Sequence, residues 1–129
     1  KAGDAEVYNP VAVFGLQEAQ NLFTDHEKRF GVHGGDLETS MMLALHPELV
    51  NQQKAQNFSS YSESRAQQFP ILGNGKSAKM SWAMQDYNPL GATGNAANAS
   101  AEKGQLLVHN FGFQLFKLLQ ELHRVNIDF

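Results

Sequence analysis

The sequence has 129 residues, 42% of them hydrophobic, which suffices for one folded domain or for part of a larger one. Its net charge of −3 and its scattered lysines and arginines argue against a nucleic-acid or an anionic membrane partner, because both need a basic surface. No run of about 18 apolar residues predicts a membrane span, and the lack of cysteine excludes disulfides and thiolate metal sites and fits a cytoplasmic location.

The first part of the chain predicts a strand followed by a helix. Residues 11–14 are β-branched or aromatic and follow Pro10, which is typical of a buried strand. Residues 16–30 carry apolar side chains at helical spacing, and within them the charged residues 24–29 are expected to face solvent. A start at Lys1 rather than at methionine fits a processed product or the C-terminal part of a longer chain.

A glycine-containing turn and a short helix follow. Gly34 and Gly35 lack a Cβ and allow the backbone to bend sharply after His33. Asp36 or Gly35 can cap a helix, and this helix must end before Pro47 because proline disfavours helical geometry at the residue before it. The apolar residues expected to form its buried face are Leu37, Met41, Ala44 and Leu45.

His33 and Glu38 are expected to converge, because the glutamate lies in the first turn of that helix. An imidazole and a carboxylate that face each other can hold a metal ion or transfer protons. Each residue also has a structural interpretation: a histidine beside glycines often only supports the fold, and a glutamate in a first turn complements the helix dipole. The spacing between them is not a specific metal signature, so both interpretations stay open.

The middle of the chain predicts one short helix, one strand and a long loop. Residues 63–69 predict one or two helical turns before a proline, and residues 78–84 alternate between polar and apolar side chains as a strand does. Residues 85–95 are rich in Gly, Asn and Pro and predict a loop. Its first residues, Gln85 and Asp86, are further candidates for polar site residues because loops at strand ends often carry them.

The longest helix is predicted near the C-terminus. Asn98 or Ser100 can cap it, and it runs to about Arg124. We expect the domain to span residues 1–125, with residues 126–129 as a short tail. The helix carries a broad apolar stripe formed by Leu107, Val108, Phe111, Leu115, Leu118, Leu119 and Leu122.

Three blocks of this sequence resemble the creatininase (creatinine amidohydrolase) family. Residues 33–43, HGGDLETSMML, followed by Pro47-Glu48-Leu49-Val50, resemble its H-A-G-x-x-E-T-S-x-M-L…P-x-x-V signature. Residues 82–94, WAMQDYNPLGATG, are similar to a late strand and a Q-D-x-x-P-x-G-x-x-G loop of that family. Ala101-Glu102-Lys103-Gly104 resembles the A-x-A-E-K-G opening of its final helix, and the resemblance covers about residues 28–122.

The resemblance implies an α/β fold with three layers, α/β/α, around a mainly parallel central sheet, of which this chain is the C-terminal portion. It implies two kinds of protein partner: the N-terminal half of the same fold, and further copies in a homo-oligomer that is usually a hexamer. It also implies a metal-dependent amidohydrolase. Such an enzyme would open a small-molecule cyclic amide, or cleave a related C–N bond, with water activated by two divalent ions, zinc, manganese or iron.

By position in the motif, Glu38 corresponds to a glutamate assigned to the metal site. His33 corresponds to the motif histidine, which would contact substrate and shuttle a proton, with Gly34 and Gly35 beside it on the substrate side. Gly34 replaces the family's usual alanine, and Arg29 stands where creatininase itself carries a tryptophan.

The family's other metal ligands, a Glu-x-His, an aspartate and a Gly-His, belong to its N-terminal half and have no match in this chain. A non-catalytic structural or interaction module is therefore the alternative hypothesis, and a small-molecule binding protein without turnover is a third.

Overall fold

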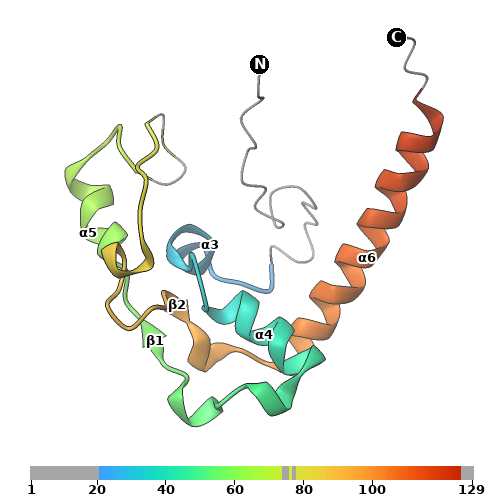
Figure 1. Cartoon of the computed structure of the whole chain (residues 1–129), viewed down its shortest axis with the longest axis horizontal. Helices are drawn as coiled ribbons and strands as arrows, with labels where there is room; N and C mark the ends of the chain where they lie inside the picture. The colour runs from blue at the N-terminus through green and yellow to red at the C-terminus, as the bar shows by residue number, and fades with distance from the viewer. Residues whose placement is uncertain (1–20, 74–75, 77, 126–129) are drawn as a thin grey trace.

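The computed structural model describes residues 21–73, 76 and 78–125. Its helices are α3 (Asp25–Phe30), α4 (Asp36–Leu45), α5 (Tyr61–Gln68) and α6 (Ala101–Arg124), and its strands are β1 (Asn57–Phe58) and β2 (Gly94–Asn95). The short 3-10 helices are η1 (Pro47–Leu49), η2 (Gln52–Lys54), η3 (Met84–Asp86) and η4 (Ala96–Asn98). In Figure 1, α4 lies beside the first turns of α6, and α5 stands on the opposite side of the molecule.

Helix α3 covers only the end of the helix predicted over residues 16–30. Residues 21–24 form a turn, and the helix begins after Thr24, whose Oγ1 accepts a hydrogen bond from the backbone N–H of Glu27 at 3.1 Å. The expectation that residues 24–29 all face solvent is wrong for Glu27, which is buried because backbone amides satisfy its carboxylate. Residues 1–20, which include the strand predicted at 11–14, lie outside the described part.

Helix α4 agrees with its prediction in position, and its predicted buried face is confirmed in part: Leu37 and Met41 pack against the core, whereas Leu45 does not. Gly35 is its N-cap, and the helix ends at Leu45, two residues before the proline. The buried side chains are those of Asp36, Ser40 and Leu43, whereas Leu45 is 55% exposed. Leu45 lies about 200° from Leu43 around the helix, so its side chain points away from α6. The polar residues Asp36 and Ser40 instead form hydrogen bonds with the start of α6.

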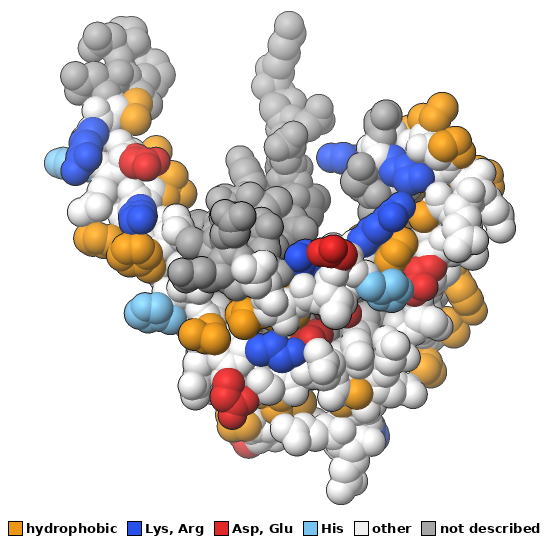
Figure 2. Space-filling model, turned by 180° about the vertical axis from the view of Figure 1, so that it is seen from behind, with side chains coloured by type: hydrophobic (Ala, Val, Ile, Leu, Met, Phe, Trp, Pro, Cys, Tyr) orange, Lys and Arg blue, Asp and Glu red, His pale blue; other side chains and the backbone are white. Residues whose placement is uncertain are grey.

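The predicted long helix is confirmed as α6, which begins at Ala101 after the N-cap Ser100. Its buried residue Leu107 packs with Phe23, and the partly buried residues around this core are Leu22, Leu37, Met41 and Phe111. The later part of the apolar stripe is exposed, as Phe116 and Leu122 illustrate. Figure 2 shows hydrophobic side chains along this exposed part of α6. No helix in the described ranges combines the length and the apolarity needed to cross a lipid bilayer.

Strands β1 and β2 form an antiparallel pair in which Asn57 faces Asn95 and Phe58 faces Gly94. The described residues are thus a mixture of helix and strand, while the three layers and the parallel sheet stay a prediction. The strand predicted over residues 78–84 is wrong: the chain there is irregular, apart from one bridge between Leu72 and Ala78, before η3 begins. Alternating polarity indicates one apolar face, as in a strand, but a strand forms only where a neighbouring backbone segment can hydrogen-bond to it.

Helix α5 confirms the helix predicted over residues 63–69 and begins two residues earlier. The early start has a local cause, because Ser60 and Glu63 form a capping box in which Glu63 Oε1 accepts the backbone N–H of Ser60 at 3.2 Å. The other oxygen of Glu63, Oε2, lies 3.1 Å from Nε2 of His26, so one side chain of α5 contacts α3.

This contact predicts an acid-sensitive link between α3 and α5. Burial raises the pKa of Glu63, but the hydrogen bonds from His26 and Ser60 outweigh it and hold the pKa below the ordinary value of 4.5. A carboxylate with a depressed pKa stabilises the fold above its unfolded pKa, and the contribution is lost as the pH falls through the folded value. We therefore expect Glu63→Gln to lower the free energy of unfolding at about pH 6 but not at about pH 3.

Urea unfolding of both proteins at the two pH values measures the effect. Glu121→Gln on exposed α6 is the matched control and should change stability at neither pH. An equal loss for Glu63→Gln at both pH values would show that the link does not depend on this carboxylate's charge.

Candidate functional site

The turn between α3 and α4 brings His33 and Glu38 together, as the sequence predicts. Nδ1 of His33 lies 3.6 Å from Oε2 of Glu38, and the two side chains are 61% and 46% exposed. The backbone N–H of Gly34 donates a hydrogen bond to the same carboxylate oxygen. The pair therefore forms a small polar site at the surface, built from one turn and the first turn of one helix.

The backbone of this turn is held by a distant part of the chain. Thr93 donates its N–H to the carbonyl of His33 at 2.8 Å, and its side-chain oxygen accepts the N–H of Val32 at 3.1 Å. Gly34 adopts φ +67°, the left-handed region that glycine enters without strain. Thr93 is fully buried, so the position of His33 depends on the loop that the second family block supplies.

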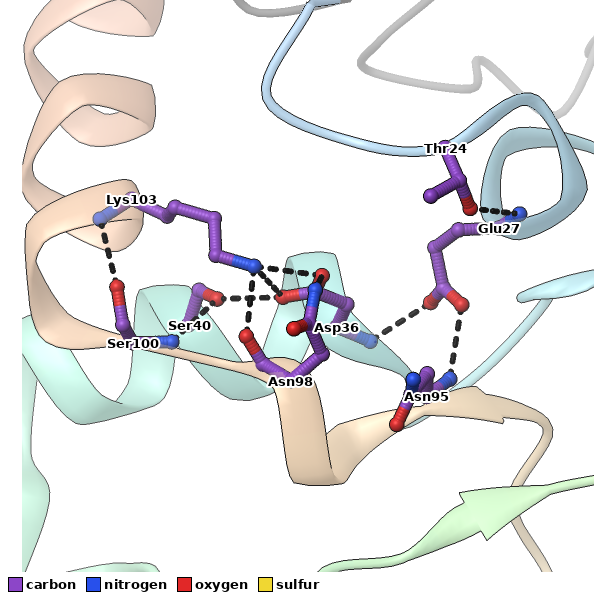
Figure 3. A network of polar contacts seen from close by, with 8 residues as sticks. All are labelled: Thr24, Glu27, Asp36, Ser40, Asn95, Asn98, Ser100 and Lys103. Carbon is purple, nitrogen blue, oxygen red and sulfur yellow. Dashed lines mark hydrogen bonds and ion pairs between the residues drawn. The ribbon is translucent and has the colours of Figure 1, made fainter.

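Glu27 is the residue that the sequence analysis missed. It is 5% exposed, and its Oε1 accepts the N–H of Asp36 at 2.7 Å while Oε2 accepts the N–H of Asn95 at 2.8 Å. Figure 3 shows its carboxylate between the start of α4 and β2. One side chain of α3 thereby joins three segments that surround the His33 turn.

Glycines make the close approach to Glu27 possible. A Cβ added to Gly94, which has φ +111°, would lie 2.5 Å from Oε1 of Glu27 and 2.9 Å from the Cα atoms of Gly31 and Gly35. Gly35 is buried against this carboxylate rather than lying open at the surface. The glycines that surround Glu27 are therefore the sequence signal for its burial. The polar composition of residues 24–29 instead suggests an exposed helix.

A second buried carboxylate, that of Asp36, joins α4 to α6. Asp36 is 2% exposed, and Nζ of Lys103 donates to both of its oxygens at 2.7 and 2.6 Å. Asn98 adds a hydrogen bond from Nδ2 at 2.8 Å, and Ser40 adds one from its hydroxyl at 3.1 Å. The aspartate of the first family block therefore pairs with the lysine of the last one, as Figure 3 shows.

Helices α4 and α6 approach closely beside this ion pair. The hydroxyl of Ser40 accepts the backbone N–H of Ser100 at 3.1 Å, at the N-cap of α6. A Cβ on Gly104 would overlap the carbonyl oxygen of Ser40 and would lie 2.8 Å from Cβ of Ala44. These contacts fix α4, and with it the first turn that carries the candidate site, against α6.

The described residues fit one edge of a metal site and not a complete one. His33 and Glu38 can supply at most two ligands, whereas a catalytic zinc site has about three from the protein. Glu27 and Asp36 cannot add to them, because backbone amides and Lys103 already engage their oxygens. Within the described ranges there is no group of three or more His, Asp or Glu placed to hold an ion.

Of the two candidates in the loop after residue 84, Gln85 and Asp86, the contacts of Asp86 give it a structural role. Oδ2 of Asp86 accepts the N–H of Ala83 at 2.8 Å and caps η3, and its carbonyl accepts Nη1 of Arg65 at 2.7 Å. Trp82 packs edge-on against Tyr87 with ring centroids 4.7 Å apart. Asp86 therefore caps η3 and connects it to α5.

The family model of creatininase, described as creatinine amidohydrolase, matches residues 2–119. The chain belongs to the creatininase family. A crystal structure of a Bacteroides fragilis protein assigned as a creatinine amidohydrolase is similar in fold, with a TM-score of 0.63 and 23% sequence identity. The similarity covers 95% of this chain and 44% of that one, so this chain spans less than half of the Bacteroides protein. Among curated proteins, none matches the sequence.

Membership of the creatininase family confirms the resemblance based on the three sequence blocks. The family's description is that of an amidohydrolase. The structure adds a physical reason why these creatininase blocks occur together. Asp36 of the first block bonds to Lys103 of the third, and His33 of the first block bonds to Thr93 of the second.

Proposed function

We propose that this chain is the C-terminal portion of a metal-dependent amidohydrolase that cleaves a C–N bond of a small cyclic amide or a related compound. The observation that carries the proposal is the convergence of His33 and Glu38 on Gly34 within the main family block. The remaining ligands would come from the N-terminal half of the fold. The coverage of 44% of the similar structure supports this division.

In this proposal, residues 1–125 form the C-terminal portion of a three-layer α/β/α domain with a mainly parallel sheet. The full domains would assemble into a homo-oligomer, which the family resemblance suggests is a hexamer. Two divalent ions, zinc, manganese or iron, would supply an activated water and polarise the amide carbonyl when bound. Glu38 would be this chain's metal ligand. The N–H of Gly34 holds Oε2 of Glu38 in place, and no hydrogen bond or ion pair engages Oε1 in the described part of the structure.

His33 would act on the proton that the leaving nitrogen needs. Its Nδ1 faces Glu38, which leaves Nε2 to contact substrate and exchange a proton with it. Its exposure gives a substrate direct access, and the bond from Thr93 keeps the backbone fixed during the transfer. Gly34 and the more deeply placed Gly35 would shape the turn on the substrate side.

Replacing Glu38 with glutamine tests the metal role. We expect Glu38→Gln to weaken zinc or manganese binding by at least about tenfold, as measured by equilibrium dialysis. In the complete native protein, the same substitution should lower catalytic turnover. His33→Gln should lower turnover with a smaller effect on metal retention, because its proposed task is proton transfer.

The control is a second histidine–glutamate pair with no proposed function. Nδ1 of His46 lies 3.1 Å from Oε1 of Glu48, and both side chains are exposed, so proximity alone is matched. Glu48→Gln should leave metal binding and turnover unchanged. Equal metal binding by Glu38→Gln and the unaltered chain would refute the proposed ligand.

A non-catalytic interaction module is the second candidate, and the exposed stripe of α6 favours it. Phe113, Phe116 and Leu119 are each about half exposed, which is unusual for side chains of this size unless another surface covers them. Intact-mass analysis of the native sample separates the two candidates. A second polypeptide bearing the missing ligands supports the amidohydrolase, whereas a single species without bound metal supports the module.

A further inference from the structure

A pocket lies between the end of α3, helix α5 and the segment that follows α5. Its walls include the aromatic residues Phe30, Phe69 and Tyr87 and the cationic residues Arg29, Arg65 and Lys76. None of the described side chains that line it is acidic. Three positive charges thus gather around one hollow without a lining carboxylate to balance them, and Figure 2 shows Lys and Arg side chains over this side of the molecule.

Arg65 is held in the pocket with part of its guanidinium unused. Nη1 donates to the backbone carbonyl of Asp86 at 2.7 Å, and the guanidinium carbon lies 4.9 Å from the centroid of the Tyr87 ring. Nη2 is buried and has no hydrogen-bond partner in the described structure. A buried donor that stays unpaired is unfavourable, and more so when it carries charge, so this atom indicates a missing acceptor.

The other two cations can act on the same acceptor. Arg29 packs over the Phe30 ring at 5.0 Å and forms no ion pair with a carboxylate of the described residues. Nζ of Lys76 donates to the carbonyls of Ala66 and Phe69 at 3.2 and 2.9 Å, which uses two of its three protons. Glu63, the acidic residue of α5, is engaged by His26.

We propose that this pocket binds an oxyanion, the carboxylate or phosphate group of a small molecule, with Nη2 of Arg65 as its principal donor. A guanidinium bonds such groups strongly because its planar N–H fork matches their oxygen atoms. Arg29 and Lys76 add positive charge, and the aromatic walls exclude water from one side. The site rests on the pocket itself and not on the proposed amidohydrolase, so binding is measurable without turnover.

Titration of the full chain with inorganic phosphate, and separately with acetate, tests the proposal by NMR of the arginine side-chain N–H groups. We expect saturable binding at millimolar concentration that shifts the Arg65 signal. Arg65→Gln should weaken binding by at least about tenfold, the loss expected for one charge-assisted hydrogen bond. Preference for phosphate would identify a phosphate group as the natural ligand, and equal or stronger acetate binding would identify a carboxylate.

Two further variants keep the result interpretable. Arg124→Gln, at the end of α6, removes the same charge far from the pocket in sequence and should leave binding unchanged. Arg29→Gln alters an exposed side chain and should weaken binding several-fold even if Arg65→Gln proves too unstable to study. Absence of saturable binding by either anion, or an equal loss for Arg124→Gln and Arg29→Gln, would overturn the proposal.

Discussion

Replacing Gly104 with alanine is expected to lower the free energy of unfolding by about 3 kcal/mol or more. The new Cβ would overlap the carbonyl oxygen of Ser40 and would lie 2.8 Å from Cβ of Ala44, so α6 and α4 would have to separate. Separation also stretches the buried ion pair between Asp36 and Lys103, because the lysine is the residue next to the substitution. Urea unfolding followed by circular dichroism measures the loss.

The same helix provides the control. A Cβ on Gly112 would meet no atom within 4 Å, so Gly112→Ala introduces alanine into α6 without a clash. Alanine favours the helix by about 1 kcal/mol over glycine, and we therefore expect Gly112→Ala to stabilise the chain slightly. Opposite signs for the two glycines would confirm the helix contact, whereas similar stabilisation by both would show that α4 and α6 do not meet at Gly104.

Glu27→Gln is expected to cost about 3 kcal/mol of unfolding free energy, since hydrogen bonds to a charged acceptor contribute about 1.5–3 kcal/mol each. Glutamine keeps the size of the side chain but replaces one carboxylate oxygen with an NH2 group. That group would face the backbone N–H of Asp36 or of Asn95, so one buried donor would lose its acceptor. Gly31, Gly35 and Gly94 surround the side chain closely and leave it little freedom to turn away.

Asp25→Asn is the matched control for that substitution. Asp25 lies two residues earlier in α3, its side chain is fully exposed, and among the described residues it forms an ion pair only with Lys28 on the same helix. Such surface pairs contribute about 0–1 kcal/mol, so we expect a change within that range. Similar effects of the two substitutions would mean that Glu27 acts only as a charge on the helix and not as a buried acceptor.

The local signals in the sequence predicted α4, α5 and α6 well, but placed the start of α3 too early. Proline at position 47, the N-cap Ser100 and the apolar spacing of residues 101–124 define α4 and α6, and each acts within one or two helical turns. The convergence of His33 and Glu38 was also predictable, because it depends only on a turn and the start of one helix.

Long-range contacts account for what the sequence did not reveal. Glu27 looked solvated because its acceptor role depends on Asn95, a residue 68 positions away. The irregular chain at residues 78–84 has the alternation of a strand, but in the described structure no neighbouring backbone pairs with it beyond Ala78. The family resemblance named Glu38 and His33, whereas Asp36 and Lys103 emerged only when α4 and α6 were placed together.

The uneven burial of α6 has a consequence for its dynamics. Its first turns are locked by Lys103, Gly104 and Leu107, while the turns after Phe111 touch little of the described structure. Because amides exchange with solvent through local opening, protection in the isolated chain should be high at the start of α6 and decline steadily towards Arg124. A surface that covers the exposed stripe would abolish this gradient, so deuterium uptake along one helix would report whether such a surface is bound.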